Sequence, residues 1–64
     1  MIKEVYHWSN DNVTVFDEKG NQMPDFQGIY LEVRDRILAT ALPSTKFYRA
    51  DWGMDKKEIS RELF

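Results

Sequence analysis

A chain of 64 residues without a single cysteine must hold its fold together with a small apolar core alone. A domain of this length buries only about 60% of the surface that its unfolded chain exposes, and neither a disulfide nor a cysteine-bound zinc ion can add stability. We therefore expect one marginally stable domain over residues 1–64. Association with a partner is one remaining source of stability.

The composition is that of a folded protein with nearly balanced charge. Apolar residues make up 42% of the chain, which has eleven acidic and nine basic residues and a net charge of −2. A positive field usually accompanies the binding of nucleic acids or anionic membranes, so this balance disfavours both. No apolar run approaches the ~20 residues of a membrane span, and the first residues do not resemble a signal peptide. We expect a cytoplasmic protein with no membrane partner.

The first part of the chain predicts a small set of strands. Residues 2–8, IKEVYHW, mix branched and aromatic side chains as strands do, and a helix is the alternative. Residues 13–17, VTVFD, alternate cleanly, and the DEKG sequence around their end predicts a hairpin turn in which Gly20 takes positive φ. Residues 21–23 are expected to return as a short strand that ends at Pro24, which lacks a ladder donor.

Residues 28–42, GIYLEVRDRILATAL, predict the main helix. We expect Asp25 to cap it, with the helix beginning near Phe26. Its end is set by Pro43, because the residue before a proline avoids the α region.

This helix has two apolar stripes. The first should cover the sheet and comprises Phe26, Tyr30, Val33, Ile37 and Ala41. The second lies about 100° round the helix and comprises Leu31, Leu38 and Leu42. One sheet face does not need both stripes, so the second requires another cover.

Residues 46–52, KFYRADW, predict a strand after the PST turn. Strand alternation assigns three residues to one face: Tyr48, Ala50 and Trp52. We expect this set to face the helices. The other set, Phe47, Arg49 and Asp51, is then left outside.

The end of the chain carries a helix-start signal. Asp55 is a good N-cap, Glu58 stands at the third helical position, and Met54 can meet Ile59 as a hydrophobic staple. These signals predict a short helix over residues 56–63. A helix this short does not persist alone in water. We therefore expect its apolar side to dock, with Ile59, Leu63 and Phe64 folding over Leu38 and Leu42.

These elements follow the order strand, strand, short strand, helix, strand, helix. Consecutive strands with helices gathered on one face give an α+β two-layer sandwich. We expect a small antiparallel sheet in ββ(β)αβα order, with one main helix and a short C-terminal helix packed on one face.

Little in the sequence points to catalysis. His7 is the only histidine, and no nucleophile motif surrounds Ser9, which is two positions away. The neighbouring carboxylates Asp17 and Glu18 lie in a predicted turn, where solvent keeps both ionised. The three glycines are isolated, so no phosphate-binding loop is present. We expect no enzymatic activity, catalytic residue, metal site, cofactor or small-molecule substrate.

The surplus apolar surface favours a non-catalytic protein–protein interaction module that self-associates, most simply as a homodimer, or that binds another protein. Leu31 is the residue of the second stripe farthest from the expected cover. Phe47 and Trp8 would add apolar surface at the sheet edge. These residues form the predicted binding surface.

The alternative function is single-stranded nucleic-acid binding through the strand Lys46–Trp52, in which rings stand beside cations. With Tyr48 and Trp52 facing the helices, only Phe47 and Arg49 would remain for a ligand. That is a poor stacking platform, and protein binding is therefore the first expectation.

Overall fold

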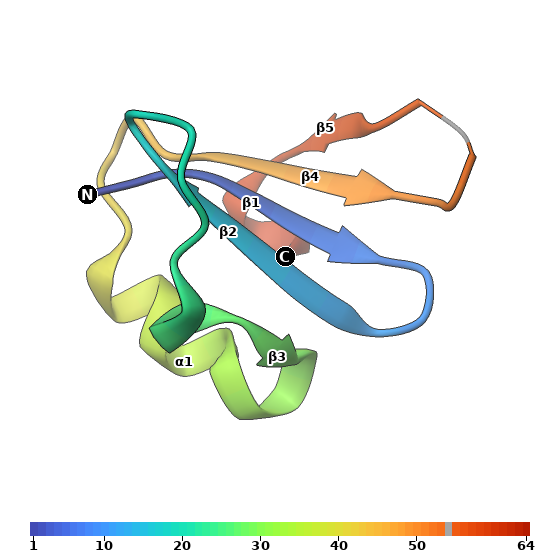
Figure 1. Cartoon of the computed structure of the whole chain (residues 1–64), viewed down its shortest axis with the longest axis horizontal. Coiled ribbons are helices and arrows are strands. Elements are labelled where there is room, and N and C mark those ends of the chain that lie inside the picture. The colour runs from blue at the N-terminus through green and yellow to red at the C-terminus, as the bar shows by residue number, and fades with distance from the viewer. Residues whose placement is uncertain (54) are drawn as a thin grey trace.

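The computed structural model describes residues 1–53 and 55–64, which form a small α+β fold with a five-stranded mixed sheet and one main helix (Figure 1). The strands are β1 (Ile2–Trp8), β2 (Asn12–Asp17), β3 (Gly28–Ile29), β4 (Lys46–Ala50) and β5 (Lys57–Ile59). The helix α1 spans Tyr30–Thr40, and single 3-10 turns occur at Pro24–Phe26 and Arg61–Leu63. Neither α1 nor the two turns is long and apolar enough to cross a membrane.

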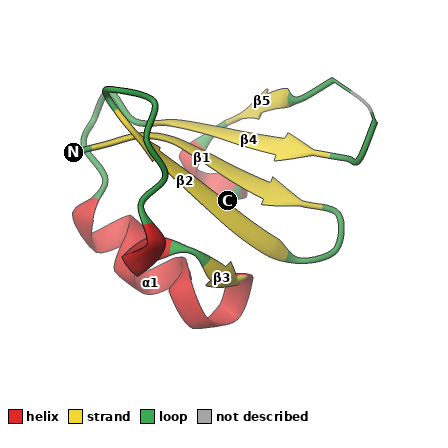
Figure 2. Ribbon diagram, in the orientation of Figure 1, coloured by secondary structure: helices red, strands yellow, loops and turns green. Residues whose placement is uncertain are grey.

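The sheet is mixed, which corrects the expected antiparallel topology. Its strand order is β3-β2-β1-β4-β5, and β1 and β4 run parallel while the other neighbours are antiparallel. Parallel neighbours need a crossover connection, and α1 supplies it. Figure 2 shows α1 beside the sheet, on the chain path that leads from β3 to the start of β4.

The core lies between α1 and one face of the sheet. Its buried members are Ile2, Val5, Val13, Val15, Val33, Ile37, Phe47 and Phe64. Phe26, Tyr30 and Ala41 pack against this cluster, so the first predicted stripe of the helix is confirmed. Each large apolar side chain that is fully buried contributes about 1.5–3 kcal/mol, which makes this layer the main source of stability.

The main helix begins later than the sequence predicts. Asp25 lies in a 3-10 turn instead of capping α1, and the residue before α1 is Ile29, which makes no side-chain cap hydrogen bond. Gly28 has a φ of +148° and pairs with Val13 of β2. This extended pairing keeps the chain out of the α region until Tyr30. The helix ends before Pro43, as predicted.

The predicted helix over residues 56–63 is wrong. The chain forms β5 instead, and Ile59 pairs with Phe47 of β4. An eight-residue helix has no stability of its own, whereas a short strand at the free edge of β4 gains ladder hydrogen bonds immediately. Asp55 is therefore not a helix cap, and the expected staple through Met54 lies outside the described residues.

The end of the chain still docks on the core. Phe64 is only 3% exposed, and its ring lies 4.9 Å from that of Phe47. Ile59 also packs against the core, as does Leu38 of the second stripe. Leu63 does not, because it is 65% exposed.

The two faces of β4 are the reverse of the sequence expectation. Phe47 is 2% exposed and lies in the core, while Tyr48 lies on the opposite face. The cause is the register with β1, in which Phe47 is the partner of Val5 and Tyr48 is the partner of Tyr6. Side chains that are partners in register share a face. Because Val5 points toward α1, Phe47 does as well.

The hairpin turn between β2 and the following residues has the predicted geometry. Gly20 has a φ of +83°, and its N–H donates to the carbonyl of Asp17 at 3.0 Å. The Asp17 carboxylate accepts hydrogen bonds from the N–H groups of Asn21 and Lys19, which lower the pKa of this carboxyl. The turn is thus held by backbone geometry and by one acidic side chain.

Replacing Gly20 by alanine should lower the free energy of unfolding by about 1 kcal/mol, because a Cβ atom is strained at positive φ. No atom lies within 4 Å of the position that this Cβ would take, so the lost free energy of unfolding comes from backbone strain and not from a steric clash. Denaturant unfolding measures it. Asparagine tolerates positive φ, so Gly20→Asn should lose less. Equal stability of the alanine variant and the wild type would contradict the constraint.

Candidate functional site

The sheet face opposite α1 carries an array of aromatic side chains. They come from β1, β2, β4 and the residues that follow β4: Tyr6, Trp8, Phe16, Tyr48 and Trp52. We call this array the open aromatic face. None of these five belongs to the core cluster or packs against it, and no described helix covers them. The face follows from strand alternation, because Tyr6 and Phe16 adjoin the buried Val5 and Val15.

Tyr6 is at the centre of the array. Its ring centroid lies 5.1 Å from that of Tyr48 and 6.1 Å from that of Trp8, both nearly parallel. Phe16 meets it edge-on at 5.5 Å. At these separations each ring pair contributes about 0.5–1.5 kcal/mol beyond its area burial. The face is therefore an ordered surface of rings.

The two tryptophans form one end of the face. Their rings stack with a centroid separation of 4.9 Å and an interplanar angle of 20°. The Trp8 Nε1–H donates to Thr14 Oγ1 at 2.9 Å, which satisfies the polar edge of this indole and fixes its orientation. Trp52 is 69% exposed, so the outer ring of the stack faces solvent.

The charges on this face are paired. Lys46 Nζ lies 3.3 Å from a carboxylate oxygen of Glu58, and Lys56 Nζ lies 3.9 Å from one of Glu4. Lys56 also sits over the rings of Tyr6 and Tyr48. Two lysines and two glutamates give the face no net charge.

Two pKa shifts follow from this arrangement. A hydrogen bond to the Tyr6 hydroxyl raises the pKa of Lys56, and burial raises the pKa of the Tyr48 hydroxyl. Groups whose folded pKa lies above the unfolded value stabilise the fold at lower pH and lose that contribution as the pH rises through the folded pKa. Lys56 and Tyr48 therefore contribute fully at neutral pH, and that contribution is lost in alkaline solution.

The three residues predicted to bind a protein, and Arg49 from the nucleic-acid alternative, are not brought together. Trp8 lies on the open aromatic face, whereas Phe47 is in the core and was wrongly placed outside. Leu31 is 79% exposed, on α1. Arg49 is exposed and lines a separate cavity with His7.

Sequence reasoning missed Tyr6 and Phe16 as members of a surface. The signal was present, because each alternates with valines that the structure buries, Val5 and Val15. What the alternation could not show is that β4 would add Tyr48 to the same face.

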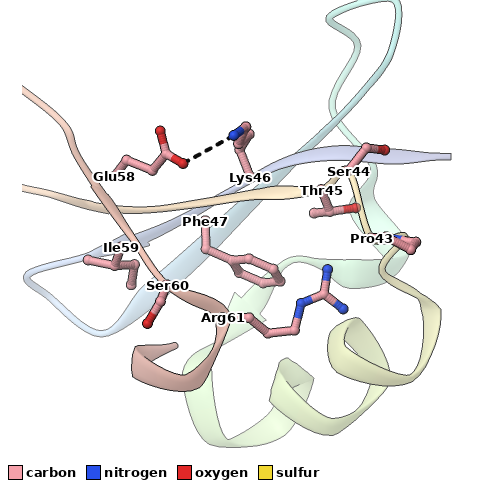
Figure 3. A pocket seen from close by; sticks show the side chains of 9 residues that line it. All are labelled: Pro43, Ser44, Thr45, Lys46, Phe47, Glu58, Ile59, Ser60 and Arg61. Carbon is pink, nitrogen blue, oxygen red and sulfur yellow. Dashed lines mark ion pairs between the residues drawn. The ribbon is translucent and has the colours of Figure 1, made fainter.

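A cavity of about 380 Å³ lies where β4 begins and β5 ends (Figure 3). Its lining comprises Pro43, Ser44, Thr45, Lys46, Phe47, Glu58, Ile59, Ser60 and Arg61. Each charged group is already engaged: Lys46 with Glu58, and Arg61 with the Phe47 ring and the Leu42 carbonyl. The lining therefore offers no free charge to a ligand.

The cavity beside His7 has a volume of about 440 Å³. His7 Nε2 lies 2.9 Å from Asp11 Oδ1, and the His7 ring stacks on Tyr30 with a centroid separation of 4.2 Å. Nucleophilic catalysis would require a hydroxyl within hydrogen-bond reach of the imidazole. The described residues show no such contact, and within residues 1–53 and 55–64 no three acidic or histidine side chains cluster as metal ligands would.

The tryptophan stack makes a spectroscopic prediction. Two indoles at this separation should give a coupled circular dichroism signal that Trp52→Ala removes. Because Trp52 is exposed, the variant should stay folded and lose only about 1 kcal/mol, the value of one ring pair. Near-ultraviolet and far-ultraviolet spectra, with denaturant unfolding, test this. A wild-type spectrum equal to the sum of two isolated indoles would contradict the stack.

The open aromatic face is thus an ordered surface of rings that the core does not use. It offers stacking rings, two lysines and two glutamates. Any functional assignment depends on this geometry alone, because comparison with protein-family models, curated proteins and solved structures found no match.

Proposed function

We propose that this protein is a non-catalytic interaction module that self-associates through its open aromatic face. The observation that supports this most strongly is the set of five aromatic side chains on the sheet face that no described helix covers. Tyr, Trp and Phe are enriched in the buried centres of protein interfaces. In the proposed dimer each chain is a two-layer sandwich of helix and sheet, and the two sheets meet face to face.

The charge pattern supports a second copy of the chain as the partner. The face carries Lys46, Lys56, Glu4 and Glu58, which sum to zero. Two copies related by a two-fold axis present the same patch to each other, so each lysine can approach a glutamate of the partner without net repulsion. A polyanion would instead bring phosphates against both glutamates.

The size of the chain supports the same proposal. A 64-residue domain with one covered sheet face leaves much of its apolar surface in water, and a partner that binds only the folded state adds to stability. Trp52 illustrates this, because it is a large apolar side chain that remains 69% exposed. Association would bury it.

Sedimentation over a concentration series tests the proposal. The average mass of the wild type should rise from 7.6 kDa toward twice that value as the concentration reaches about 500 μM, where weak dimers register. Trp52→Glu should raise the dissociation constant at least about 30-fold, as expected for an interface hot spot. Leu31→Glu, at a similarly exposed position on α1, is the matched control and should change nothing.

Other outcomes would be decisive. A wild type that stays monomeric throughout the series rules out self-association. Loss of the dimer in Leu31→Glu but not in Trp52→Glu would move the interface to the helix. Circular dichroism checks that both variants remain folded. We expect this because both substituted side chains are exposed.

Single-stranded nucleic-acid binding is the second candidate, and one observation favours it. Tyr48 and Trp52 lie on the open face beside Tyr6 and Trp8, where bases could stack on them. The objection that these rings would face the helices therefore no longer applies. The remaining objection is electrostatic, because such platforms normally sit in a positively charged groove and this face is neutral.

Titration with fluorescently labelled single-stranded DNA and RNA at low salt separates the two candidates. Because the face is neutral, we expect no binding at tens of micromolar, where even nonspecific nucleic-acid binders register. Binding that weakens steeply with salt and disappears in Trp52→Ala would place nucleic acid first.

A further inference from the structure

The side chains of the open aromatic face are sorted by type along the strands. At one end, Glu4 of β1 is the register partner of Lys46 of β4. In the middle, Tyr6 and Tyr48 are register partners, and their rings stack. At the other end lies the stack of the two tryptophans. The face therefore has a charged end, a tyrosine centre and a tryptophan end.

This order restricts how two copies can meet. Packed sheets commonly align their strands, and a two-fold dimer can do so with its axis between the sheets, either across the strands or along them. An axis across the strands would place the charged end of each copy against the tryptophan end of the other. The charged groups would then lose water without gaining an opposite charge, which is costly. An axis along the strands instead places each end against the same end of the other copy.

The charges also select the position of the axis. Directly over β1, the axis would bring Glu4 against the same glutamate of the second copy, and directly over β4 it would do the same to Lys46. Midway between β1 and β4, Glu4 of each copy lies opposite Lys46 of the other. The same position sets Tyr6 opposite Tyr48, so ring meets ring at the centre of the interface.

We infer that two copies pack with their two-fold axis between β1 and β4 and parallel to both strands. This inference rests on the proposed self-association and specifies which side chains meet in it. It is compatible with the ion pairs within each chain, because Glu4 lies 3.9 Å from Lys56 and Lys46 lies 3.3 Å from Glu58. In the dimer, each of these four groups keeps its own-chain partner, and Glu4 and Lys46 gain a second one from the other copy.

A charge-swap experiment tests the arrangement. In Glu4→Lys alone, or in Lys46→Glu alone, like charges meet across the axis, so each variant should dimerise at least about tenfold more weakly than the wild type. In an equimolar mixture of the two variants, the heterodimer has opposite charges at both contacts. Sedimentation should then give a dissociation constant within about threefold of the wild-type value. Any damage within a chain is the same alone and in the mixture, so only a contact between chains explains the rescue.

The matched control makes the same changes of charge away from the face. Lys19 lies in the hairpin turn, Glu32 lies on α1, and both are exposed. Mixing Lys19→Glu with Glu32→Lys should give no rescue, because these positions do not meet. Equal rescue in this pair, or no rescue in the first pair while the wild type dimerises, would overturn the arrangement and leave self-association standing. A monomeric wild type would overturn both.

A second measurement uses the wild type and does not depend on the stability of a variant. Isotope-filtered nuclear Overhauser spectra of a mixture of carbon-13-labelled and unlabelled chains detect only contacts between copies. We expect contacts between the Tyr6 ring of one copy and the Tyr48 ring of the other, and between indole rings of the two copies. Contacts from an indole to the methylene groups of Glu4 or Lys46 would instead show an axis across the strands and would overturn the inference.

Discussion

The parallel pairing of β1 with β4 determines what each face of the sheet is made of. β1 lies between β2 and β4, so it joins β2 and β3 on one side of the sheet to β4 and β5 on the other. Its register places Phe47 beside Val5 in the core and Tyr48 beside Tyr6 on the other face. A shift of one residue would exchange the two faces of β4. The core and the open aromatic face both depend on this one alignment.

Features that arise from neighbouring residues could be predicted from the sequence. The hairpin turn at Gly20, the position of β4 and the apolar stripe of α1 are set by turn chemistry and by periodicity. The start of α1 was predicted too early, because the Asp25 cap signal competes with the pairing of Gly28 to β2. A local cap contributes about 1 kcal/mol, and tertiary pairing can override it.

Features that need a distant partner could not be predicted. Both faces of β4 hold aromatic residues, so alternation alone cannot tell whether Phe47 or Tyr48 is buried, and only the register with β1 decides. The same holds for β5, where a good helix-start signal gave way to the free edge of β4. Among the predicted site residues, Trp8 lies on the open aromatic face. Leu31 lies on α1, and Arg49 lines the cavity beside His7. The sequence could not show which residues meet, because the face is assembled from strands that are far apart in the sequence.

The open aromatic face is partly covered by its own chain, and this bears on how tightly any partner can bind. Trp52 stacks on Trp8, and Lys56 lies over Tyr6 and Tyr48, both supplied by the connection between β4 and β5. A partner that needs the same ring faces must first displace these contacts. The ring pair alone is worth about 0.5–1.5 kcal/mol, so displacing it weakens binding by up to about tenfold. The same contacts cover part of these ring faces in the free chain, so the association proposed above would have to replace them.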